Sequence, residues 1–354
     1  MAVRRRWSGR RIVWVGLAVG LLTAVGIVIA GLLYEARMRQ TIRDAGGTIG
    51  ISAELPWWLQ WTSRAEWLEP PELLLPVSLL NLRDVRIDHR VWQAALHVCG
   101  PELFAFSLSD QLSDEQLRQL TSRLPGLLSL EANGSHLTPS GLHSLLNCPN
   151  LEDLYLTGLQ SNGNALDVLP ELKQLQSLML FNGEFQAADL RTISRCRRLS
   201  YLACGNIMPP ATQFERPVDL LQLQSLYLDG SGVSDDFVSQ FARSPKLQFI
   251  GLDDTPVTGA CLKQLSTLPG LIWLDLDGTS LEEQYLRHLR AFPKVGSVNL
   301  SNTLISDAAV PLLLQCTTLR FLHLDGTRVS EEGLKQLQEQ FPDCRITPEP
   351  AAVK

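Results

Sequence analysis

The sequence contains none of the short motifs that mark common catalytic sites. It has no phosphate-binding P-loop, no His-Glu-x-x-His zinc motif, no Gly-x-Ser-x-Gly nucleophile turn and no Cys-x-x-Cys pair. Its six histidines show no paired spacing of metal ligands. We therefore expect a protein that is not an enzyme and that has no cofactor and no metal site.

Acidic residues are absent from the first 34 positions, which carry five arginines. The remaining 320 residues hold 26 basic and 37 acidic groups. A nucleic-acid-binding protein of the usual basic kind has the opposite balance, so we expect no nucleic-acid partner. Only 7% of all residues are aromatic, whereas roughly a fifth are leucine, which is ample apolar material for a core.

Charge of either sign is absent from residues 12–34, which read IVWVGLAVGLLTAVGIVIAGLLY. A helix of this length spans about 30 Å of hydrocarbon, and the run exceeds the apolar region of about 7 to 15 residues in a cleavable signal peptide. The arginines before it favour a cytoplasmic N-terminus. The sequence thus predicts a cytoplasmic tail (1–11), a single transmembrane helix (12–34) and a periplasmic or otherwise extracytoplasmic remainder.

A 24-residue period runs through most of the remaining chain. Each unit opens with an apolar-x-x-apolar-x-apolar segment, as in Leu271, Leu274 and Leu276. The first position of successive units is occupied by Leu103, Leu127, Leu151, Leu175, Leu199, Leu223, Leu247, Leu271, Val295 and Leu319. An earlier copy begins at Val77. Such a period indicates a solenoid of stacked repeats.

Each unit is predicted to form one strand, a turn and one helix. In the unit from Leu271, Asp-Gly-Thr forms the turn, and Leu286, Leu289 and Phe292 recur on one helical face. The unit from Leu199 differs, since Pro209, Pro210 and Pro217 oppose a regular helix.

These units resemble the leucine-rich-repeat family. Units such as SLYLDGSGVSDDFVSQF and FLHLDGTRVSEEGLKQL look most like bacterial membrane-anchored proteins with Thr-x-Val-Ser/Thr repeats. The ninth position departs from the common family pattern, because it holds Thr255, Thr279, Thr303 and Thr327 where asparagine is usual. A threonine hydroxyl can still satisfy backbone groups of the turn.

Strands stack more closely than helices, so the solenoid must bend with the strands inside. We predict an α/β fold, a curved horseshoe with a parallel concave sheet and convex helices over residues 77–346. Residues 35–76 are predicted to be a juxtamembrane and N-terminal cap segment, and residues 347–354 a tail. The cap segment should include a helix up to Asp44 and a short strand from Thr48 to Ala53.

Half of the tryptophans, Trp57, Trp58, Trp61 and Trp67, lie in this cap segment. They could cover the exposed core of the first unit, or they could form an interfacial belt at the lipid headgroups.

The cysteines are predicted to be unpaired. Cys99, Cys148, Cys196 and Cys316 recur at about the same small core position of the unit, and no two of them fall in adjacent units. Stacking at about 5 Å per unit places them beyond the reach of a disulfide.

Residues between the apolar strand positions should face the concave side. The predicted binding residues there are aromatic and acidic: Tyr201, Tyr227, Phe249, Trp273, Phe321, Asp229, Asp253, Asp275, Asp277 and Asp325. Aromatic groups beside acids suit a basic or polar partner. The aspartates are also good turn residues, and three of them, Asp253, Asp275 and Asp277, could instead hold a divalent cation.

Two functions fit these observations. The first is a non-enzymatic, membrane-anchored protein that binds a protein or peptide through its concave face outside the cytoplasm, with the membrane contacted through residues 12–34. The second is a structural or scaffolding component of the cell envelope without a specific concave-face ligand.

Overall fold

The computed structural model describes residues 30, 32–51, 77–83, 85–100, 103, 105–134, 136–159, 164–183, 187–205 and 220–348. Most of the expected transmembrane segment, the clustered tryptophans, the proline-rich stretch 206–217 and the end of the tail lie outside these residues. In the described part of the chain, no helix is both long and apolar enough to cross a membrane.

The described strands form one sheet in which they follow one another in sequence order. They are β1 (Thr48–Ile51), β2 (Val77–Leu82), β3 (Ala105–Gln111), β4 (Ser129–Asn133), β5 (Asp153–Thr157), β6 (Ser177–Phe181), β7 (Tyr201–Gly205), β8 (Ser225–Tyr227), β9 (Phe249–Gly251), β10 (Trp273–Asp275), β11 (Ser297–Asn299), β12 (Phe321–His323) and β13 (Arg345–Thr347). From β2 onward all neighbours are parallel.

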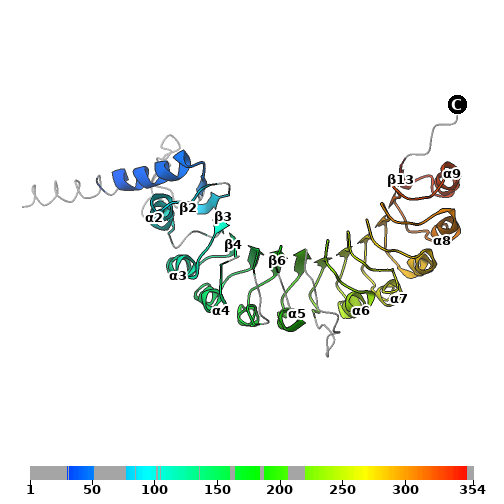
Figure 1. Cartoon of the computed structure of the whole chain (residues 1–354), viewed down its shortest axis with the longest axis horizontal. Coiled ribbons are helices and arrows are strands. Elements are labelled where there is room, and N and C mark those ends of the chain that lie inside the picture. The colour runs from blue at the N-terminus through cyan, green and yellow to red at the C-terminus, as the bar shows by residue number, and fades with distance from the viewer. Residues whose placement is uncertain are drawn as a thin grey trace, which may run out of the picture.

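Short helices cover the other side of the sheet. The α-helices are α2 (His89–Val98), α3 (Asp114–Arg123), α4 (Pro139–Leu142), α5 (Ala187–Ile193), α6 (Asp235–Ser239), α7 (Leu262–Leu265), α8 (Val310–Leu313) and α9 (Glu331–Gln340). The 3-10 helices are η3 (His143–Asn147), η4 (Leu169–Glu171), η5 (Gln240–Arg243), η6 (Glu283–Ala291) and η7 (Asp307–Ala309). Figure 1 shows the resulting arc, with strands inside and helices outside, which confirms the predicted horseshoe solenoid.

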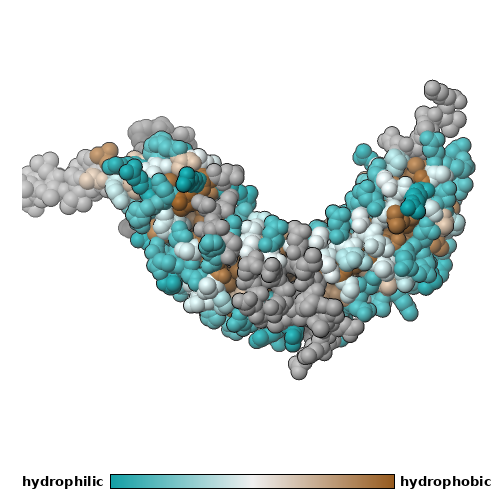
Figure 2. All heavy atoms as spheres, in the orientation of Figure 1, coloured by the Kyte–Doolittle hydropathy of each residue, from teal (hydrophilic) through white to brown (hydrophobic). Residues whose placement is uncertain are grey.

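The core lies between the sheet and the helices, and the repeated apolar positions fill it. Leu271, Leu274 and Leu276 are fully buried, as the strand pattern predicts. The face of the arc seen in Figure 2 is mostly hydrophilic along its outer rim, and apolar residues show near the two ends.

The helix predicted on the convex side of the unit from Leu271 is present, and it is the 3-10 helix η6. A 3-10 helix has three residues per turn, so side chains three positions apart lie on one line. Leu286, Leu289 and Phe292 have this spacing, and all three are at most 3% exposed. The three-residue step in the sequence therefore belongs to a 3-10 helix.

Threonine closes the turn of several units. Thr255 Oγ1 donates to the Leu252 carbonyl oxygen (2.6 Å), and Thr279 Oγ1 donates in the same way to Leu276 (2.7 Å). Thr303 and Thr327 repeat the bond in their own units. These hydroxyls satisfy turn carbonyls, as the sequence suggested for the residues that replace asparagine.

The N-terminal end of the solenoid is covered by a helix that ends at Asp44 and by β1. Gly46 has a φ of 94°, which is the left-handed conformation that often ends a helix. Ile42 is fully buried, so this helix contributes to the core. The predicted helix and short strand are both present. However, β1 pairs antiparallel with β2, which differs from the all-parallel sheet that the repeats predict. β1 belongs to no repeat unit, so no crossover helix fixes its direction.

All seven cysteines are buried and free. The Cys148 thiol donates to the Leu124 carbonyl oxygen at 3.1 Å. Burial raises the pKa of this thiol to about 11 and that of Cys99 to about 12. The cysteines are thus neutral core residues, in agreement with the sequence.

Candidate functional site on the concave face

Alternate strand residues face the concave side in a register that is continuous from unit to unit. In the register of the parallel strands, Tyr201 lies beside Ser225, Ser225 lies beside Phe249, and Phe249 lies beside Trp273. The line continues through Ser297 to Phe321, which is 47% exposed. The structure therefore places four of the predicted aromatic residues, Tyr201, Phe249, Trp273 and Phe321, in one row across β7 to β12.

Tyr227 joins this row to form an aromatic cluster. It stands two positions further along its strand and faces Gly251 on β9. Its ring centroid lies 5.5 Å from that of Tyr201 and 5.9 Å from that of Trp273, which is two strands away. Ring centroids at such distances attract one another. We call Tyr201, Tyr227 and Trp273 the aromatic cluster.

Glycine makes the position of Tyr227 possible. A Cβ atom at Gly251 would lie 2.7 Å from Tyr227 Cδ1, closer than real carbon contacts allow. The ring of Tyr227 thus packs directly on the backbone of β9 at Gly251, which has no side chain. Without this glycine, Tyr227 could not lean across β9 toward Trp273.

A second aromatic pair, which is not among the predicted binding residues, also packs over a glycine of the neighbouring strand. Tyr155 and Phe181 pack edge to face with centroids 5.7 Å apart. Phe181 faces Gly205 on β7, where a Cβ would lie 2.5 Å from Phe181 Cδ1. The sequence contains a signal for such packing, because an aromatic residue at a concave-facing strand position is followed 24 positions later by a glycine.

The acidic residues lie beside the aromatic cluster, and several of them stabilise the turns. Asp229 Oδ1 accepts a hydrogen bond from the Asp253 backbone amide (3.3 Å). Asp275 is only 6% exposed and accepts from the backbone amide of Asp277 (3.0 Å) and from Asn299 (3.2 Å). Asp277 itself accepts from Asn302 (2.8 Å). Asp325, on a more distant unit, accepts from Thr347.

Asp253 is a carboxyl group that the fold holds close to other aspartates. Burial raises the pKa of Asp253 to about 8, and a side-chain hydrogen bond with Asp275 and the charges of Asp275, Asp229 and Asp277 act in the same direction. Asp253 Oδ1 is buried and accepts no hydrogen bond within the described part of the chain. Burial also raises the pKa of Asp229. Part of the acidic row is therefore neutral at moderate pH.

The concave face offers aromatic surface and carboxylates, which can bind but do not form a nucleophile and base pair. His323, the histidine on β12, contacts Thr347 Oγ1 through Nδ1 (3.0 Å). Within the described ranges, no group of three His, Cys, Asp or Glu side chains is arranged to hold a metal ion, and this includes the trio Asp253, Asp275 and Asp277.

No protein-family model matches the sequence, and no curated protein matches it. Solved structures do resemble it. A chain of the mouse RP105/MD-1 complex has a TM-score of 0.51 and 22% identity over 67% of this chain and 41% of that chain. An internalin from Listeria monocytogenes has a TM-score of 0.47 and 15% identity, and the match covers 81% of this chain and 93% of that chain. A leucine-rich-repeat protein from Leptospira interrogans has a TM-score of 0.46 and 15% identity, and the match covers 73% of this chain and 86% of that chain.

The comparison at a TM-score above 0.5 agrees with the 24-residue period and with the stacked strand-and-helix units. The chain therefore resembles the leucine-rich-repeat proteins and has their fold.

Proposed function

We propose that the chain is a non-enzymatic binding protein whose concave face holds a protein or peptide partner with cationic side chains. The observation that carries this proposal is the aromatic cluster beside the row of aspartates. Aromatic side chains dominate the binding energy of many interfaces, and cations bind to aromatic faces and to carboxylates. The mouse RP105 structure is a complex with another protein, MD-1, which is consistent with this use of the fold.

The rigidity of the surface supports the same proposal. The cluster spans β7 to β10, and the inward side chains of the last three of these strands, Leu226, Ile250 and Leu274, are fully buried. Binding groups that are already held in place lose little entropy when a partner arrives. Trp273 itself is half-buried and packs against Tyr227, so part of its indole is exposed to solvent.

Membrane anchoring is part of the proposal and rests on the sequence. The charge-free segment 12–34 would hold the solenoid at a membrane, with the N-terminus in the cytoplasm and residues 35–354 outside. The concave face would then meet partners in the periplasm or at another extracytoplasmic site.

A capture experiment with matched variants tests the binding function. Residues 35–354 are used to capture proteins from an envelope extract, in parallel with Trp273→Ala, Tyr227→Ala and the control Leu146→Ala, an exposed apolar residue of the convex 3-10 helix η3. The concave variants should lose a partner that the wild type and the control retain. Retention by every variant would favour the scaffolding alternative, in which the concave face has no specific ligand.

A further inference from the structure

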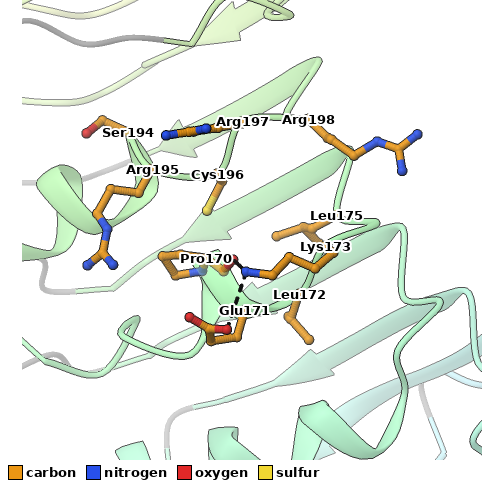
Figure 3. Close-up of a pocket in the computed structure, with 10 residues that line it drawn as sticks. All are labelled: Pro170, Glu171, Leu172, Lys173, Leu175, Ser194, Arg195, Cys196, Arg197 and Arg198. Atoms are coloured by element: carbon orange, nitrogen blue, oxygen red, sulfur yellow. Dashed lines mark hydrogen bonds and ion pairs between the residues drawn. The ribbon is translucent and has the colours of Figure 1, made fainter.

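A cleft of about 750 Å³ opens between two successive units, away from the concave face. It is lined by the turns 170–175 and 194–198, which directly precede β6 and β7. The cleft therefore lies at the edge of the solenoid where the strands begin. We call it the basic cleft, and Figure 3 shows its lining residues.

The lining carries four cations and one acid. Lys173 donates to the Pro170 carbonyl oxygen (2.9 Å) and pairs with Glu171 (3.3 Å), so this acid is already engaged. Arg198 donates to the side-chain amide oxygen of Gln174. In Figure 3, Arg195 and Arg197 extend to one side of the cleft and Arg198 to the other.

Arg195 and Arg197 have no hydrogen-bond acceptor among the residues that the structure describes. Within the ranges that the structure describes, no carboxylate or carbonyl group accepts a hydrogen bond from either guanidinium group. The chain as a whole carries a net charge of −6, so this local excess of positive charge runs against the overall composition. Cations held close together without a counter-charge repel one another, and a bound anion would remove that repulsion.

The equivalent cleft near the C-terminal end provides an internal comparison. It lies between the turns 317–320 and 340–344, has a volume of about 240 Å³ and is lined by one arginine, Arg320, and one acid, Asp343. The basic cleft is therefore both larger and far more positive than the same groove in another part of the solenoid. In the described part of the unit before it, the convex helix is the three-residue η4 (Leu169–Glu171).

We propose that the basic cleft binds an oxyanion, a phosphate group in free or esterified form. The planar guanidinium fork matches the oxygens of phosphate in geometry and charge. Arg195 and Arg197 hold the anion, while Lys173 adds positive charge from the opposite turn. Cys196 lies in the wall, and burial raises the pKa of its thiol to about 12, so it stays neutral beside the anion. This site is independent of the concave face.

The test uses the full chain in a non-ionic detergent at low ionic strength and calorimetric titration with two probes, inorganic pyrophosphate and glycerol phosphate. The wild type should bind at least one probe. The double variant Arg195→Gln/Arg197→Gln should weaken that binding by about tenfold or more, because charge-assisted hydrogen bonds are lost. Arg320→Gln, in the smaller cleft, is the matched control and should bind as the wild type does.

The two probes distinguish the sources of the phosphate group. Tighter binding of pyrophosphate indicates a free phosphate compound, and tighter binding of glycerol phosphate indicates a monoester such as a lipid headgroup carries; either result supports the site. Failure of both probes to bind overturns the proposal, and so does an equal loss in the Arg320 variant. Trp273→Ala should leave the titration unchanged, so the result does not depend on the concave-face function.

Discussion

The ring of Tyr227 lies over Gly251, the residue that faces it on the neighbouring strand. This contact lets Tyr227 reach Trp273 across β9 and creates one aromatic surface from three separate units. A glycine that bears no binding group of its own thus decides the shape of the candidate site.

Replacement of this glycine should disrupt the cluster without removing any binding group. In Gly251→Ala the new Cβ would lie 2.7 Å from Tyr227 Cδ1 and 2.9 Å from Asp229 Oδ1, so both side chains must move. We expect a loss of about 1–3 kcal/mol in the free energy of unfolding, measured by urea denaturation, together with weaker partner binding. Gly100→Ala is the control, since nothing lies within 4 Å of its Cβ. Equal effects of the two substitutions would contradict the role of Gly251 in making room for the ring of Tyr227.

Trp273 should matter for binding more than for folding. Trp273→Ala is expected to change the free energy of unfolding by less than about 1 kcal/mol, and to weaken partner binding by about 2 kcal/mol or more. Leu274→Ala, at the fully buried next position, should cost about 2–5 kcal/mol of stability. The reverse order of stabilities would mean that the strand register is shifted by one residue.

The raised pKa of Asp253 predicts a dependence of stability on pH. In the folded chain the pKa of Asp253 is raised to about 8, whereas an unfolded aspartate titrates near pH ~4. Between these values the folded chain binds more protons, so the free energy of unfolding should fall as the pH rises. Asp253→Asn should flatten this dependence, whereas Asp343→Asn, at an exposed position, should not. Thermal unfolding over this pH range would measure it, and an unchanged slope in the Asp253 variant would disprove the assignment.

The repeat cysteines should contribute packing and no cross-links. Cys148→Ala is expected to lower the free energy of unfolding by about 1–2 kcal/mol, at the low end for core truncations. Because all cysteines are free, the stability of the wild type should be the same with and without a reductant. Mass spectrometry that found a Cys148 to Cys196 bridge would contradict the stacking of the units.

The proposed topology can be checked with a reporter. A fusion after Lys354 to an enzyme that is active only outside the cytoplasm should be active, because five arginines precede the apolar segment. The matched fusion to a reporter that is active only in the cytoplasm should be silent. Activity of the cytoplasmic reporter alone would reverse the orientation and move the search for partners inside the cell.

The repeat architecture could be predicted from the sequence because its signal is local and repeated. The pattern of apolar residues at Leu271, Leu274 and Leu276 defines which side chains of the strand face inward. The period of 24 residues defines which strands are neighbours. The row from Tyr201 to Phe321 follows directly from these two facts. The direction of β1 did not follow from them, since it lies outside the period.

The details of the site depend on contacts that a repeat pattern does not contain. The reach of Tyr227 across β9 depends on its rotamer and on the space above Gly251. The basic cleft depends on how two turns of neighbouring units lie relative to each other. The run Ser-Arg-Cys-Arg-Arg at 194–198 was visible in the sequence, but only the fold brings it next to Lys173.

The threonines at the turns have a consequence for how such a chain can change over evolutionary time. Thr255 and Thr279 bond to carbonyl groups of their own units. Neighbouring turns are joined instead by backbone bonds, as from the Asp254 amide to the Asp277 carbonyl oxygen (2.8 Å), and by side chains such as Asn302, which donates to Asp277 (2.8 Å). Neighbouring units need no matching side chains at the threonine position. A substitution of one of these threonines would therefore alter the turn of its own unit first, whereas a change at Asn302 would also affect the turn of the preceding unit.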